Sequence, residues 1–174
     1  VIYDKAYEHV SRILLSYFTY QRCGSDLGWA GKCHTDDGII KETGEFVINL
    51  TTSSMCKVVD FCGVRSGDKI NKFEKCNIHK APSSIVKAPL IEESPLSLEC
   101  KVKEIKSLGT HDMFIAEIVA IDIEEKYIDS KGKLNLQQAG LLSYAHGEYF
   151  ATGRKLGDFG YSVRKKSKKN IKRK

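Results

Sequence analysis

The chain has 174 residues, of which 41% are hydrophobic and 29% charged, and its formal net charge is +6. This length suits one domain with a substantial core, and the composition is typical of a soluble globular protein. No apolar run reaches the roughly 18 residues of a membrane-spanning helix. The first residues also lack the basic-then-apolar order of a signal peptide. We therefore expect a cytoplasmic protein without membrane contact.

The positive charge is concentrated at the carboxyl end. Residues 164–174, RKKSKKNIKRK, hold eight of the 28 basic side chains and no acid. The rest of the chain has 20 basic and 22 acidic side chains. Like charges at this density repel each other, which predicts a disordered tail. No aromatic residue lies among them to stack on a base, which favours a solubilising end over a nucleic-acid contact.

Six cysteines occur, at positions 23, 33, 56, 62, 76 and 100. A domain of this length does not need disulfides to fold, and no Cys-x-x-Cys pair is present. Cys33-His34 has no second ligand pair at the spacing of a zinc site. We expect reduced thiols that serve mainly as small core residues, and no metal site.

The first half of the chain contains three predicted elements. Apolar residues at spacings of three and four predict a helix within residues 1–22, which the glycines of CGSDLGWAG end. Residues 44–50, GEFVINL, alternate as a half-buried strand does. In residues 51–54, TTSS, hydroxyl groups are expected to cap a short helix. One face of that helix would hold Met55, Val58, Val59 and Cys62.

The next segment, CGVRSGDKINKF at residues 62–73, is rich in glycine and in groups that suit an anion. Arg65, Ser66 and Lys72 offer donors to anionic oxygens, and the glycines allow close approach of the backbone. The segment is not a P-loop, because the Gly-x-x-x-x-Gly-Lys-Ser/Thr pattern is absent. From these residues alone, a solvated turn and a loop that binds a phosphate-bearing ligand both remain open.

Two long strands are predicted in the second half. In residues 94–105, SPLSLECKVKEI, the alternation places Leu96, Leu98 and Cys100 on one face of a strand and Glu99 on the other. Residues 113–124, MFIAEIVAIDIE, are apolar on both faces. They need cover on both sides, from a barrel interior within and, as one option, another subunit outside. A short Gly-containing connection makes the pair a hairpin, and Glu117 needs a partner in this apolar setting.

The remaining segments are short. IDSKGKL (residues 128–134) predicts a turn, NLQQAGLL (135–142) a short helix, and YAHGEYFATG (144–153) an irregular or strand-like piece. Alternating strands with few helices predict a mainly β protein built as a small barrel.

Two histidines are candidates for chemistry. His111 lies at the mouth of the predicted hairpin, next to Asp112, which could hold one ring nitrogen; a simple turn histidine is the alternative. His146 lies among aromatic residues that could pack either a flat ligand or the edge of a core. No Ser-His-Asp order, paired carboxylates or metal-ligand cluster is present, so the sequence does not support hydrolytic chemistry.

Five blocks taken together resemble the flavin reductase-like, flavoredoxin-type family, whose members are FMN-binding split β-barrels. The resemblance covers about residues 38–166, and the blocks occur in the family order. They are IIKETGEFVINLTT, DFCGVRSGDKINKF, APLIEESPLSLECKVKEI, LGTHDMFIAEIVAID and GLLSYAHGEYFATGRKLGDFGYSVRKK. We divide the chain into an atypical segment that lacks the first barrel strands (1–37), the split-barrel domain (38–163) and the basic tail (164–174).

The resemblance implies a fold, a cofactor and an activity. The fold would be an antiparallel, Greek-key split β-barrel with a few short helices, assembled as a homodimer. The activity would be transfer of electrons from NAD(P)H to FMN, or onward to a redox partner protein. The cofactor carries this chemistry, which agrees with the absence of a side-chain nucleophile.

The resemblance also implies the site residues. His111 matches the histidine beside the flavin and nicotinamide and is the candidate catalytic residue. The expected cofactor-binding residues are Trp29, Ala30, Gly31, Ser66, Gly67, Lys72, Phe73, His146 and Tyr149. Three alternatives remain open: an electron-transfer protein without reductase activity of its own, a degenerate non-catalytic relative, and a β-barrel that binds nucleic acid through its tail.

Overall fold

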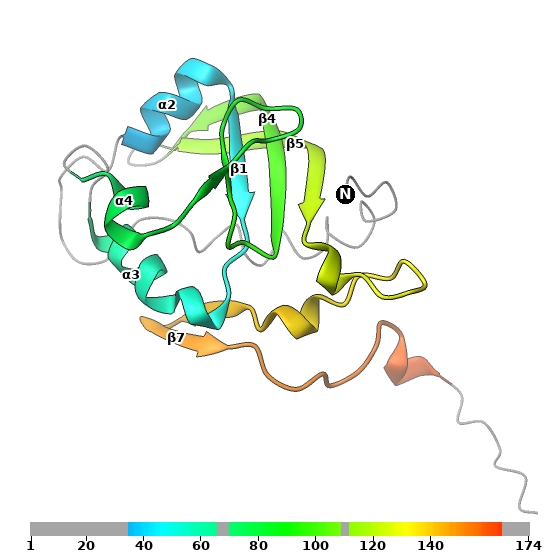
Figure 1. Cartoon of the computed structure of the whole chain (residues 1–174). Helices are drawn as coiled ribbons and strands as arrows, with labels where there is room; N and C mark the ends of the chain where they lie inside the picture. The colour runs from blue at the N-terminus through cyan, green and yellow to red at the C-terminus, as the bar shows by residue number, and fades with distance from the viewer. Residues whose placement is uncertain (1–34, 66–69, 109–111, 165–174) are drawn as a thin grey trace, which may run out of the picture.

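The computed structural model describes residues 35–65, 70–108 and 112–164 (Figure 1). The helix expected within residues 1–22 and the basic tail from residue 165 onward lie outside these ranges. The longer elements are α2 (Thr35–Thr43), β1 (Glu45–Asn49), α3 (Cys56–Val64), α4 (Lys72–Cys76), β4 (Leu96–Ser107) and β5 (Asp112–Ile123). The shorter ones are η1 (Ser53–Met55), β2 (Lys80–Ala81), β3 (Leu90–Ile91), η2 (Glu125–Tyr127), η3 (Leu136–Ala139), β6 (Leu142–Ala145), β7 (Glu148–Ala151) and η4 (Tyr161–Val163).

The centre of the fold is a three-stranded antiparallel sheet in the order β1-β4-β5. Phe46 of β1 lies opposite Cys100 of β4, and Leu98 of β4 lies opposite Ile121 of β5. Two further antiparallel pairs, β2 with β3 and β6 with β7, complete the described strands. The strand expected at residues 44–50 and the hairpin of two long strands are therefore confirmed.

A β-bulge explains why residues 113–124 are apolar at both odd and even positions. Glu99 pairs with Ala120 and the next residue, Cys100, pairs with Ile118, so Val119 is an extra residue in β5. Such a bulge interrupts the alternation of side chains between the two faces. Side chains before and after the bulge consequently pack on one core: Ala116 and Ile118 on one side, Ile121 and Ile123 on the other. This part of the pattern needs no second subunit.

The other face of the sheet is covered by the segment between β2 and β3. Glu99 lies on this face, opposite Leu98 and Cys100 as the alternation predicted, and it is 0% exposed there. Its carboxylate accepts the backbone N–H groups of Ser84, Ile85 and Val86 at 2.6, 2.7 and 2.8 Å. The next N–H group, that of Lys87, donates to Glu45 at 2.6 Å. Four consecutive backbone donors thus hold the segment on the sheet.

The hydrophobic core lies on the face of the sheet formed by the even positions of β4. It extends to the segments on either side of η3, where the N–H of Leu142 donates to the carbonyl of Thr51 at 2.9 Å. The buried residues of this core are Leu50, Leu96, Leu98, Cys100, Ile121, Ile123, Tyr127, Ala139 and Leu141.

One smaller expectation is corrected. The hydroxyls of residues 51–54 do not cap a helix, because Ser53 instead donates to the carbonyl of Gly140 at 2.8 Å and Thr52 pairs with Ser54 at 2.7 Å. Glu117 has the partner that it was expected to need, Lys103 at 2.5 Å, although it lies on the exposed surface and not in an apolar setting. The short helix at residues 135–142 is present as the 3-10 turn η3.

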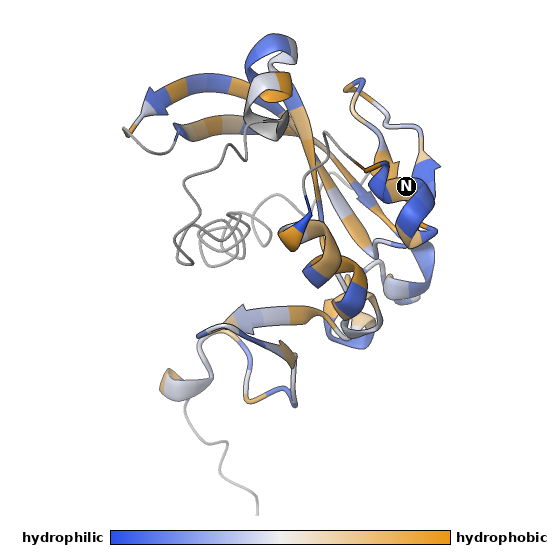
Figure 2. Cartoon of the chain, turned by 90° about the vertical axis from the view of Figure 1, so that its left-hand side faces the viewer, coloured by the Kyte–Doolittle hydropathy of each residue, from blue (hydrophilic) through white to orange (hydrophobic). Residues whose placement is uncertain are grey.

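The segment after β7 runs away from the sheet (Figures 1 and 2). It exposes large apolar side chains: Leu156 is 84% exposed, Phe159 87% and Val163 82%. None of the helices in the described part of the chain is long and apolar enough to cross a membrane. This finding does not test the expected cytoplasmic location.

Candidate functional site

The candidate site is the junction of α3 and α4, which border the glycine-rich segment. The ammonium group of Lys72, at the start of α4, donates to the carbonyl oxygen of Cys62 at 2.9 Å. Cys62 lies in the last turn of α3, where carbonyl groups lack partners within the helix and a cation is favoured. Lys72 therefore ties the two helices together.

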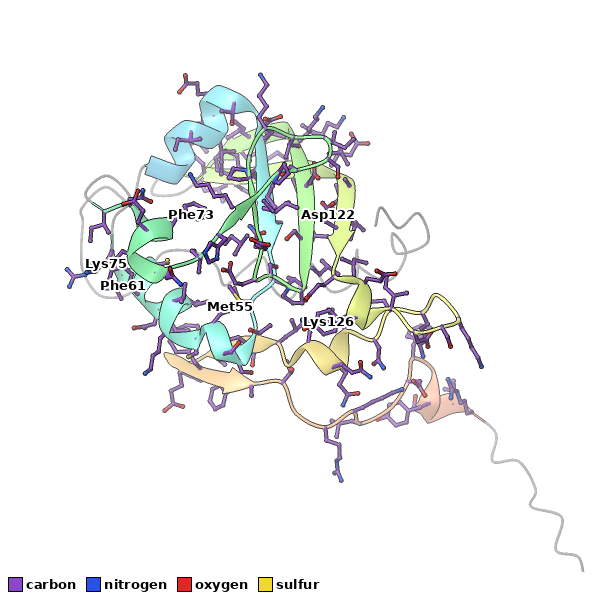
Figure 3. The ribbon with its side chains drawn as sticks, in the orientation of Figure 1. Met55, Phe61, Phe73, Lys75, Asp122 and Lys126 are labelled. Carbon is purple, nitrogen blue, oxygen red and sulfur yellow. The ribbon has the colours of Figure 1, made fainter. Side chains whose placement is uncertain are left out.

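The short helix α4 is fixed at its far end by Asn77. This residue has a left-handed conformation, with φ at 51°, and its N–H bonds to the carbonyls of Phe73 and Glu74. Asparagine adopts this conformation more readily than most residues, and it commonly ends helices. Phe73 also lies under the ammonium group of Lys80, at 4.5 Å from the ring centroid. Figure 3 shows Phe61 of α3 on the same side of the molecule as Phe73 and Lys75 of α4.

Tyr149 of β7 also contacts α3. Its hydroxyl donates to Asp60 at 3.2 Å, and its ring lies 4.9 Å from that of Tyr144. Burial, followed by the bond to Asp60, raises the pKa of Tyr149 to about 12. The hydroxyl therefore remains protonated at neutral pH. The helix α3 thus contacts two of the expected site residues, Lys72 through Cys62 and Tyr149 through Asp60.

His146 occupies a turn. It has φ at 55° and is followed by Gly147 with φ at 84°, so these two residues connect β6 and β7. Positive φ at both central positions is the mark of a type I′ hairpin turn. The side chain is exposed, so His146 does not belong to the edge of the core.

Six of the expected site residues lie outside the described part of the chain: Trp29, Ala30, Gly31, Ser66, Gly67 and His111. Their positions in the site remain predictions. Asp112, one possible partner for a ring nitrogen of His111, forms an ion pair with Lys41 of α2.

A shallow surface depression adjoins the glycine-rich segment. It has a volume of about 400 Å³ and is lined by Ile70, Asn71, Glu74 and Lys75. The depression is open to solvent and offers one carboxylate, one ammonium group and one amide. It lies on the α4 side of the site, next to Lys72 and Phe73 in the sequence.

Sequence reasoning missed two features of this site. Asp60 was not recognised as the partner of Tyr149, since the two are far apart in the sequence. Cys62 and Cys76 were expected to be core thiols, whereas both are only partly buried and lie near the ends of α3 and α4. The position of both cysteines next to the glycine-rich loop was the available signal.

The fold defines a protein of the split-barrel class. The family model described as "Flavin reductase like domain" matches residues 32–153. The chain belongs to that family. The fold class expected from the sequence is also confirmed, because similar solved structures include flavin reductase-like split barrels.

Among the curated relatives, an uncharacterized protein of Archaeoglobus fulgidus is 35% identical over 118 residues, which cover 68% of this chain and 65% of the relative. Two further curated relatives are covered to 58% and 57% of their lengths. The chain thus spans less than two thirds of the length of these curated relatives.

Two flavoredoxin structures are similar to this one. The flavoredoxin of Desulfovibrio vulgaris (Miyazaki F) has a TM-score of 0.70 and 24% identity, covering 77% of this chain and 73% of that one. The flavoredoxin of Methanosarcina acetivorans has a TM-score of 0.64 and 32% identity, and the match covers 75% of this chain and 71% of that one. The first likeness supports the fold, and the second also supports relationship in sequence.

Proposed function

We propose that the chain binds FMN and passes electrons from NAD(P)H to flavin or to a redox partner protein. The observation that carries the proposal is the clamp between α3 and α4, which lies inside the matched flavin reductase-like domain and fixes both ends of the glycine-rich segment. When bound, the flavin would supply the hydride and electron chemistry. The protein would need only to bind and orient it.

The donor set at the clamp suits an anionic cofactor. An ammonium group carries three N–H donors, and the structure gives one of those of Lys72 to the carbonyl of Cys62. The others suit phosphate or carbonyl oxygens of FMN. In this proposal Ser66 and Gly67 contact the cofactor beside Lys72, and Phe73 and Tyr149 contribute apolar surface. The backbone of Trp29, Ala30 and Gly31 would line the isoalloxazine ring.

The first experiment is an absorption spectrum after the protein is mixed with FMN and desalted. We expect the yellow flavin bands to stay with the protein. Lys72→Met should weaken FMN binding about tenfold, the effect of one lost charge-assisted hydrogen bond. Lys126→Met is the matched control, since that exposed lysine pairs with Glu124 and lies far from α4 (Figure 3). Failure of the folded chain to retain FMN at high micromolar concentration would end the proposal.

The second experiment concerns His111. If this histidine orients the nicotinamide, His111→Ala should slow reduction of the bound flavin at least tenfold and leave the flavin spectrum nearly unchanged. Stopped-flow absorbance after mixing with NADH or NADPH measures both the reduction rate and the flavin spectrum. Unchanged reduction rates with both nucleotides would remove His111 from the mechanism.

The similarity to two flavoredoxins favours one alternative, an electron-transfer protein without reductase activity of its own. Such a protein would be yellow and would not oxidise NAD(P)H until a partner was added. The same absorbance assay, run with and without an added reductase, distinguishes the two functions. A colourless protein that binds nucleic acid only when residues 164–174 are present would instead favour the third alternative.

A further inference from the structure

Lys80, the first residue of β2, is a cation that the proposed function does not use. Its ammonium group lies 4.5 Å from the centroid of the Phe73 ring, which is within the range of a cation–π contact. The ion pairs formed among the described residues do not include Lys80. Its positive charge is therefore held beside α4 without a carboxylate partner from that part of the chain.

A second cation–π contact has a different charge balance. Lys126 lies 5.0 Å from the centroid of the Tyr127 ring, and its ammonium group also pairs with Glu124 at 2.6 Å. The charge of Lys126 is thus neutralised by a carboxylate. An aromatic face holds an ammonium group without cancelling its charge, so Lys80 remains able to attract an anion.

The position of Lys80 is fixed by the strands around it. Lys80 pairs with Ile91 of β3, whose N–H group donates to the side-chain oxygen of Asn49 in β1 at 3.0 Å. The preceding residue, His79, donates its N–H group to Glu93 at 3.1 Å, and its ring atom Nδ1 lies 2.6 Å from the same carboxylate. The backbone of Lys80 is consequently tied to the central sheet, and its ammonium group contacts α4 from a fixed support.

We propose that Lys80 is a positioning residue of the cofactor site, which holds the ring of Phe73 and adds a positive charge that favours reduced over oxidised FMN. The inference rests on the proposed function, in which Phe73 contributes surface to the flavin. Reduction of FMN takes up two electrons and one proton and leaves a negative charge on the ring system. A nearby cation stabilises that charge and shifts the equilibrium toward the reduced form.

The test is a reductive titration of the FMN-loaded full chain with dithionite, followed by absorbance beside a reference dye. Together with the potential of free FMN, it gives the ratio of the affinities for reduced and oxidised FMN. Lys80→Met should lower this ratio about threefold to tenfold, the effect of one charge in a partly aqueous setting. Lys80→Arg keeps the charge and the cation–π contact, so its ratio should stay within about twofold of that of the natural protein.

Lys126→Met is the matched control. It also removes a lysine that lies over an aromatic ring, but the charge of this lysine is already neutralised by Glu124. The affinity ratio of Lys126→Met should therefore equal that of the natural protein.

A measurement without flavin tests the contact itself. Urea unfolding of the cofactor-free natural protein, Phe73→Leu, Lys80→Met and the double variant forms a double-mutant cycle. We expect the two substitutions to be coupled by about twofold to fivefold in the unfolding equilibrium constant, the size of an exposed cation–π contact. The same curves show whether each variant is folded.

An unchanged affinity ratio in folded Lys80→Met would overturn the inference, and so would an equal change in Lys126→Met or Lys80→Arg. Additive effects in the urea cycle would also overturn it, because Lys80 would then not hold Phe73. In all these outcomes the natural chain still retains FMN, so the proposed function stands. A natural chain that retains no FMN would end the proposed function as well, which distinguishes the two failures.

Discussion

Glu99 shows how far the environment of one residue can depart from its sequence pattern. Burial alone would raise the pKa of Glu99, but the hydrogen bonds from three backbone N–H groups outweigh it, and the pKa is lowered. For Asp122, burial and the nearby Glu99 raise the pKa, and its atom Oδ2 is buried without a hydrogen-bond partner. The two carboxyl groups therefore have opposite effects on stability.

This contrast predicts different outcomes for two isosteric substitutions. Glu99→Gln should destabilise the fold by about 2–4 kcal/mol, because it removes the charge that three N–H groups bind. Asp122→Asn should be neutral or stabilise it by up to about 1 kcal/mol at neutral pH, since it removes a charge that the site disfavours. Urea unfolding measures both, and a similar loss in the two variants would contradict this account.

The pH dependence of stability follows from the same pair. The contribution of Glu99 is present above its unfolded-state pKa and is lost as the pH falls through its lower folded-state pKa. Asp122 works in the opposite sense, because its raised pKa costs stability as the pH rises through the folded value. The urea concentration at the unfolding midpoint should therefore decrease for the natural protein as the pH is lowered from neutral to acid. In Glu99→Gln this decrease should be much smaller.

Alternation placed the apolar members of β4 on one face and Glu99 on the other, as the structure has them, but it gave no sign that the second face is covered. A charged residue between Leu98 and Cys100 normally faces solvent on a strand with one covered face. Its partners, the N–H groups of residues 84–86, belong to a segment with no strand or helix pattern. No local signal connects that segment to Glu99, so the buried carboxylate could not be predicted.

At the scale of elements, the hairpin β6–β7 allows a test of His146. Asparagine is preferred at the first position of a type I′ turn, followed by glycine. His146→Asn should therefore leave stability unchanged or raise it by about 0.5 kcal/mol. If the ring of His146 also contacts the cofactor, the same variant should lose FMN affinity. Thermal melting and FMN titration of one protein separate the two roles, and a clear loss of stability would contradict the turn assignment.

The strands β1, β4 and β5 were predictable because alternation and β-branched residues mark them. The helix α2 was not expected, since TDDGIIKET contains a glycine, and isoleucine and threonine are weak helix formers. The bulge at Val119 was also hidden, because a single extra residue in an apolar run has no signature in one sequence. Of the candidate site, the sequence located the glycine-rich segment, whereas the contacts of α3 with Lys72 and Tyr149 required the structure.

At the scale of the whole molecule, we propose that the chain forms a homodimer through its carboxyl-terminal segment. Leu156, Phe159 and Val163 are more than four-fifths exposed, and such a row of apolar residues is unusual on a monomer. The double variant Leu156→Ser, Phe159→Ser should therefore convert the dimer to a monomer. Light scattering after size exclusion gives the mass, and Lys131→Ser on an exposed turn is the control. A monomeric natural chain would overturn the proposal.

The four consecutive donors of residues 84–87 have a consequence for hydrogen exchange. Amides in a segment without helix or sheet normally exchange quickly with solvent. The amides of Ser84, Ile85 and Val86 should instead exchange slowly, at rates close to those of the central strands. If the segment separated from the sheet, the buried carboxylate of Glu99 would lose its hydrogen-bond donors. In Glu99→Gln this protection should fall first in residues 84–86, which would reveal the segment as part of the most stable unit of the protein.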